Sequence, residues 1–137
     1  MAIKNAKIVS FTVPGGKRAA GVARRSVLSS KVGVPGIMRQ RLALLLSELV
    51  TNAIQHGGAG AHETIQVRLA SNAKKVRVEV YDPGSPDGVP RDRLETETGG
   101  FGLLLVDRIA DGWGRQELGS GGSLAWFELD VEGLAEA

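Results

Sequence analysis

The chain has 137 residues, of which 42% are hydrophobic and 23% are charged, so its length and composition are those of one globular domain with a substantial core. It has no cysteine, which excludes disulfides and thiolate zinc sites, and a net charge of +2 with only 4% aromatic residues argues against a nucleic-acid binder. No apolar run approaches the ~20 residues that span a bilayer, and no apolar signal segment follows the N-terminal MAIKNAK, so we expect a cytoplasmic protein.

The N-terminal part is predicted to form a strand followed by a helix. Residues 7–13 alternate between apolar and polar side chains, and a Pro-Gly-Gly sequence ends this strand. Residues 17–30 have apolar side chains at helical spacing, and Gly33 and Pro35 indicate a turn after this helix.

A longer helix is predicted over residues 37–56, with a broad apolar arc of leucine, valine, methionine and alanine. Glu48 and Asn52 lie outside this arc, and their four-residue spacing places both on one face about one turn apart. A carboxylate and an amide in this arrangement can act as a general base beside a metal ligand. They can also be two wetted surface residues, and the spacing alone favours this second interpretation.

Two strands follow at residues 64–71 and 75–82, and the short link between them suits an antiparallel hairpin. Asp82 has the same parity as the valines of the second strand, so it is predicted to point toward the core side of the sheet. An ionised carboxylate in that position requires a strong hydrogen-bond donor, or its pKa rises. The alternative is a strand-end carboxylate that caps the next turn.

Residues 83–99 are polar, proline-rich and too long for a simple connection in a compact domain, and segments of this kind are usually functional lids or are disordered. A glycine-rich turn then opens a helix over residues 103–110. Such a turn presents free backbone N–H groups and the positive end of a helix dipole, which together favour phosphate.

The C-terminal part is predicted to form strands at residues 113–118 and 123–130, joined by a glycine-rich hairpin loop, with a frayed tail at residues 131–137. Hairpin strands with helices between them indicate an α+β fold. We therefore expect one domain over residues 1–137, with a single, mostly antiparallel sheet and helices packed on one face.

Three motifs occur in a fixed order: SELVTNAIQHG on the long helix, YDPGSP at a strand end and GGFGLLLV at the junction of loop and helix. In this order they resemble the GHKL, or Bergerat-fold, ATP-binding domain, and the resemblance implies that fold with a flexible ATP lid. The sequences SELVTNAIQH and WFEL are most similar to those of the anti-sigma-factor serine/threonine-protein kinases, of the stand-alone actinomycete type.

The resemblance implies a role for each matching residue of the first two motifs. Glu48 matches the catalytic general base, which would accept a proton from an attacking hydroxyl. Asn52 matches the asparagine whose side-chain oxygen binds Mg²⁺. Asp82 matches the aspartate that accepts a hydrogen bond from the adenine amine, and Gly84 matches the small residue that lets the base lie against the backbone.

The third motif and the last strand match the family less completely. Gly100 and Gly102 match the turn under the phosphates, and Leu103 starts the following helix. Phe101 stands where many relatives have a basic residue. Relatives also have a threonine that supports the adenine-binding aspartate, and alignment on WFE puts Leu124 there. Ser123, one residue earlier, is our candidate substitute.

The resemblance implies an ATP- and Mg²⁺-dependent protein serine kinase and anti-sigma factor, which sequesters a sigma factor and phosphorylates an anti-anti-sigma partner. It implies a homodimer, and neither nucleic acid nor membrane is an expected partner. Phe101 and Leu124 favour the alternative of a non-catalytic nucleotide-binding anti-sigma or partner-binding module. A small ATPase without a protein substrate is a third possibility.

Overall fold

The computed structural model describes residues 3–56, 63–83, 101–119 and 121–132. One antiparallel sheet runs through them in the order β1-β2-β3-β5-β4, confirming the predicted α+β class. The strands are β1 (Lys7–Pro14), β2 (Thr64–Ser71), β3 (Lys75–Asp82), β4 (Gly112–Glu117) and β5 (Ser123–Asp130), and the helices are α1 (Ala19–Ser29), α2 (Gly36–His56) and α4 (Phe101–Ile109).

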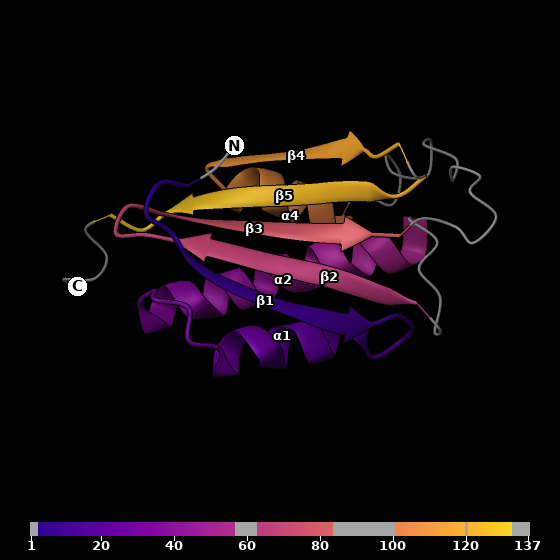
Figure 1. The fold of residues 1–137 in the computed structure, drawn as a ribbon, viewed down its shortest axis with the longest axis horizontal. Helices are drawn as coiled ribbons and strands as arrows, with labels where there is room; N and C mark the ends of the chain where they lie inside the picture. Colours follow the sequence, from indigo (N-terminus) through magenta and orange to yellow (C-terminus); the bar gives the residue numbers. More distant parts are fainter. Residues whose placement is uncertain (1–2, 57–62, 84–100, 120, 133–137) are drawn as a thin grey trace.

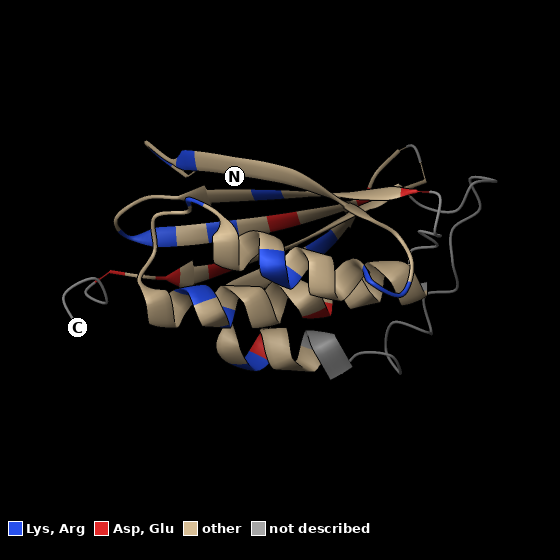
Figure 2. Cartoon of the chain, turned by 90° about the horizontal axis from the view of Figure 1, so that it is seen from below, with Lys and Arg blue, Asp and Glu red and all other residues tan. Residues whose placement is uncertain are grey.

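The three helices lie on one face of the sheet, as Figure 1 shows from the opposite face and Figure 2 shows edge-on. The long helix α2 runs through the middle of this layer and contacts α1, α4 and the central strand β3. No helix within the described ranges is long and apolar enough to cross a membrane.

Helix α2 supplies much of the core because its apolar residues recur at helical spacing. Leu42, Leu45, Leu46 and Val50 are completely buried against the sheet and the neighbouring helices. Asn52 is also buried, with 8% of its surface exposed, although the pattern placed it outside the apolar arc. A helix flanked by two others on a sheet buries a wider face than its apolar residues mark, so the alternative of a wetted surface position is wrong for Asn52.

The predicted boundaries of β2, β3 and β5 agree with the structure, and those of β1, β4 and the helices differ by one or two residues at most ends. The β2–β3 hairpin is held by Asn72, whose Oδ1 accepts hydrogen bonds from the N–H groups of Lys74 and Lys75 at 2.8 and 2.9 Å. The predicted lid lies outside the described residues, apart from Pro83.

The prediction of a frayed tail beginning at residue 131 is wrong at its first residue. Val131 is buried, with 4% exposed, and its N–H donates to the carbonyl oxygen of Lys74 at 2.9 Å. Burial of the side chain and pairing of the backbone with the β2–β3 hairpin therefore carry the ordered chain beyond the end of β5.

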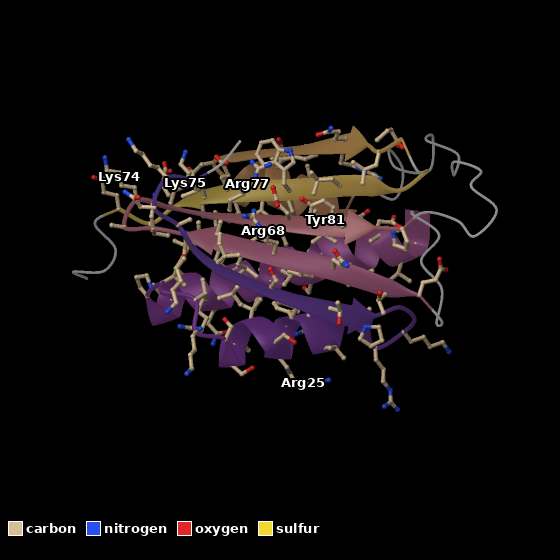
Figure 3. The ribbon with its side chains drawn as sticks, viewed as in Figure 1. Arg25, Arg68, Lys74, Lys75, Arg77 and Tyr81 are labelled. Atoms are coloured by element: carbon tan, nitrogen blue, oxygen red, sulfur yellow. The ribbon has the colours of Figure 1, made fainter. Side chains whose placement is uncertain are left out.

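The face of the sheet away from the helices carries a network of ionised side chains, and Arg68, Arg77 and Tyr81 lie together there in Figure 3. Glu79 is at its centre and accepts hydrogen bonds from Arg68 Nη1 at 3.3 Å, Arg77 Nε at 3.0 Å and Tyr81 Oη at 3.1 Å. Arg77 Nη1 also donates to Glu128 Oε2 at 2.9 Å. We call these five residues the open-face network.

Burial opposes the ionisation of Glu79, but the hydrogen bonds from Arg77 and Tyr81 and the charge of Arg77 outweigh it, so the pKa of Glu79 is lowered from its usual 4.5. Burial and the neighbouring charge of Glu79 raise the pKa of Tyr81 above its usual 10.0. The Arg77 guanidinium also lies 4.2 Å from the ring centroid of Trp126. The network therefore holds its charges in mutually compensating positions.

Candidate functional site

A small pocket lies on the helix side of the sheet, where α2 passes over one end of the central strands. Its volume is about 10 Å³, which is room for about one water molecule. Apolar and polar side chains from four elements meet there: Leu49, Asn52, Ala53, Val80, Asp82, Arg115, Ser123 and Ala125.

Asp82 lies at the end of β3 and is buried, with 4% exposed, as its parity predicted. It makes polar or electrostatic contact within the chain. Ser123 is its cross-strand neighbour on β5 and lines the same pocket. Leu124 instead pairs with Tyr81, whose side of β3 is the open face, so the hydroxyl placed beside Asp82 is that of Ser123.

Asn52 reaches the same pocket from the last part of α2. Its Nδ2 donates to the backbone carbonyl oxygen of Glu48 at 2.9 Å, which directs the amide. Its Oδ1 is buried and accepts no hydrogen bond from the described part of the chain. A buried acceptor without a donor is unfavourable by about 1–3 kcal/mol, so this oxygen is available to a cation or to a ligand donor.

Glu48 lies one turn before Asn52 on α2 and is half-buried. It is not among the residues that line the pocket. The structure thus brings Asn52, Asp82 and Ser123 together in the pocket. Glu48 is a neighbour of Asn52 along α2 and lies outside the pocket lining.

The other predicted site residues belong to the glycine-rich segments. Gly84 and Gly100 lie outside the described residues. Gly102 and Leu103 lie in the first turn of α4, where the structure describes their backbone. Their predicted contacts with phosphate remain a prediction.

Two residues at the pocket were not predicted from the sequence. Arg115 enters the pocket from β4, and the signal for it is that it shares strand parity with Trp113, which packs against the core. Gly122 immediately precedes β5 and lies against the end of β3. A Cβ atom at this position would overlap the carbonyl oxygen of Asp82. Glycine at this position therefore allows β5 to begin against the backbone that carries Asp82.

The described residues contain no group of three or more histidine and acidic side chains that could hold a metal ion by themselves. Mg²⁺ commonly takes only one or two protein ligands and completes its shell with water and phosphate oxygens. The Asn52 Oδ1 atom fits such a partial ligand set, because it is an oxygen with no competing donor among the described residues.

The fold, an antiparallel sheet with helices on one face, is consistent with the GHKL class of ATPase domains. The family model for the histidine kinase-like ATPase domain matches residues 17–126, most of the chain. The chain therefore belongs to this family, which confirms the GHKL resemblance at that level.

Two individual proteins are similar to this chain in sequence. The chain is 30% identical over 114 residues to Blue-light-activated histidine kinase 2 of Erythrobacter litoralis, covering 81% of this chain but 32% of that protein. It is 33% identical over 75 residues to an uncharacterized protein of Streptomyces coelicolor, covering 54% of this chain and 71% of the relative. The chain thus spans about a third of the length of the first relative and most of the second.

Among solved structures, the blue-light activated histidine kinase EL346 of Erythrobacter litoralis is similar, with a TM-score of 0.51 and 21% sequence identity. The match covers 85% of this chain and 42% of that one. At this identity the likeness shows that the two chains share a fold.

Proposed function

We propose that this chain is an ATP- and Mg²⁺-dependent protein serine kinase that holds its nucleotide in the pocket between α2, β3 and β5. One observation carries the proposal: Asn52 Oδ1 is buried in that pocket without a hydrogen bond from the described residues. An acceptor kept in such a position is stabilised when a ligand or cation completes its coordination.

The remaining lining residues suit the base end of ATP. Asp82 is the acceptor for the adenine amine, and the Ser123 hydroxyl beside it supports that carboxylate. Val80, Ala53 and Ala125 offer small apolar walls for a flat ring. Specific polar groups beside small apolar ones favour a heteroaromatic ligand.

The position of Glu48 one turn before Asn52 supports the proposed reaction. A serine Oγ of the protein substrate attacks the γ-phosphorus of ATP, the bond between that phosphorus and the β,γ-bridging oxygen breaks, and ADP leaves. The serine proton passes to the Glu48 carboxylate. Mg²⁺, held by Asn52 Oδ1 with phosphate and water oxygens, would supply charge neutralisation on the phosphates.

The protein partners are proposed from the sequence resemblance. We propose that the substrate is an anti-anti-sigma protein and that the unoccupied kinase holds a sigma factor. Phosphorylation would release the first partner and leave the kinase free to bind the second.

Label transfer tests the kinase directly. The purified chain with ATP labelled in its γ-phosphate is expected to label a cognate anti-anti-sigma protein. The Glu48→Gln variant is expected to lower the rate by about 10²–10⁴-fold, the usual contribution of a general base, with nucleotide affinity retained. Exposed Gln55 lies two turns later on α2, and Gln55→Ala is the matched control. Equal transfer by wild type and Glu48→Gln would remove Glu48 from its proposed role.

The second candidate is a non-catalytic binding module of the same fold, favoured by the small volume of the ligand-free pocket, about 10 Å³. Calorimetric titration with ATP and Mg²⁺ separates the two. No heat of binding at millimolar nucleotide, with sigma factor still captured, would favour the binding module.

A further inference from the structure

We propose that Arg115 controls the entry of the nucleotide base into the pocket, an inference that rests on the proposed nucleotide site and adds a residue to it. Arg115 is half-buried on β4, lines the pocket beside Asp82 and Ser123, and has the only cationic side chain among the described lining residues. A guanidinium at the base end of a nucleotide pocket competes with a neutral ring unless it can move away.

The register of β4 and β5 places Arg115 on the helix side. Arg115 pairs with Ala125, and Trp113, two residues earlier, pairs with Phe127, so both side chains point toward the core face. Ala125 is small and leaves space over β5 for a long side chain. Because β4 is at the edge of the sheet formed by the described strands, Arg115 has one of these strands on one side only.

The pocket is too small for a base as it stands, so entry of a base between the described lining residues requires one of their side chains to move. Ligand pockets usually measure about 300–1,000 Å³, whereas this one measures about 10 Å³. Leu49 and Val80 are each 1% exposed and fixed in the core, and Asn52 is tied to the Glu48 carbonyl. The other lining residues, Ala53, Ala125 and Ser123, are already small, and Asp82 is the proposed acceptor.

Arg115 itself makes a polar, ring or electrostatic contact within the chain, and among the described lining residues its side chain is long enough to exchange that contact for water. Its long aliphatic stem can lie along the edge of the sheet while its head reaches water. Because Arg115 and Asp82 line the same pocket, the guanidinium would compete with the adenine amine for the Asp82 carboxylate. Nucleotide then binds to the fraction of molecules in which Arg115 has swung out, and the apparent Kd rises in inverse proportion to that fraction.

Three ligands test this inference by calorimetry: adenosine, ADP with Mg²⁺, and inorganic tripolyphosphate. Arg115→Ala is expected to bind adenosine and ADP about tenfold more tightly than wild type, as when about a tenth of ligand-free molecules have an open pocket. Its affinity for tripolyphosphate is expected to stay within about twofold, because the phosphates lie beyond the base end. Exposed Gln116 is the neighbour that points to the opposite face, and Gln116→Ala is the matched control.

Arg115→Gln, which is shorter and uncharged, is expected to shift adenosine affinity in the same direction and serves if Arg115→Ala unfolds. Unchanged affinity for adenosine in both variants overturns the inference. Weaker binding of ADP and tripolyphosphate overturns it too, because Arg115 would then contact phosphate. If wild type and variants all fold, as judged by circular dichroism, but none binds ADP, the proposed nucleotide site is itself wrong.

Discussion

The open-face network and the pocket under α2 both bury polar side chains, and they differ in how those side chains are satisfied. On the open face, Glu79 receives hydrogen bonds from three donors, and Arg77 is shared between Glu79 and Glu128. In the pocket, Asn52 Oδ1 accepts none from the described residues. A completed network stabilises the fold, whereas an incomplete one among small side chains is where a ligand is expected.

The largest expected effect comes from breaking the open-face network. Glu79→Ala leaves Arg77, which is 6% exposed, with Glu128 as its carboxylate partner. We expect the free energy of unfolding to fall by about 3 kcal/mol, because removing one member of a buried ion pair leaves an inadequately compensated charge. Urea denaturation measures this change, and nucleotide affinity should stay within about twofold.

The control for this prediction is Lys75→Ala. Lys75 pairs with Glu128 at 3.4 Å, but 43% of its side chain is exposed. Its removal should lower the free energy of unfolding by less than about 1 kcal/mol. Equal losses in the two variants would show that the buried pair of Arg77 and Glu79 contributes no more to the free energy of unfolding than the exposed pair of Lys75 and Glu128.

The second prediction concerns the pocket, where a substitution is expected to change ligand affinity much more than stability. Asn52→Ala removes the unsatisfied oxygen together with one hydrogen bond to the Glu48 carbonyl, so the free energy of unfolding should change by about 1 kcal/mol or less. The Mg²⁺-dependent affinity for ATP should fall about thirtyfold, equivalent to about 2 kcal/mol. Calorimetry with and without Mg²⁺ measures it. A large loss of stability with normal affinity would make Asn52 a structural residue.

The third prediction concerns the backbone beneath the pocket. Gly122→Ala pushes a methyl group against the carbonyl oxygen of Asp82 and should lower the free energy of unfolding by about 1–2 kcal/mol, as overpacking does. ATP affinity should fall with it, because the clash displaces the strand end that carries Asp82. Thermal unfolding measures the loss of stability. Gly119→Ala in the same loop is the control, because the space around its Cβ position is open.

The smallest expected effect is the pH dependence of the open-face network. Because the folded-state pKa of Glu79 is lowered, its contribution to stability is present above its usual pKa of 4.5 and is lost as pH falls through the folded value. Urea midpoints of wild type and Glu79→Gln should therefore differ most above pH 4.5 and converge as the pH falls below that value. A gap that widens toward acid would contradict the sign of the shift.

Local patterns were enough to predict much of this molecule. The alternation of side chains located β2, β3 and β5 and turned Asp82 toward the core, because strand periodicity depends only on neighbouring residues. Helical spacing placed Glu48 and Asn52 one turn apart for the same reason. The three ordered motifs indicated the GHKL class, which the family match confirms.

Cross-strand register and helix packing decided the rest. They selected Ser123 over Leu124 beside Asp82, buried Asn52, brought Arg115 into the pocket and joined Glu79 to its three donors. These pairings connect residues far apart in the chain, and no local period specifies which residue of one strand will face which residue of another. The sequence by itself determined the class of the protein and the direction of single side chains, whereas the tertiary structure decided which of them meet.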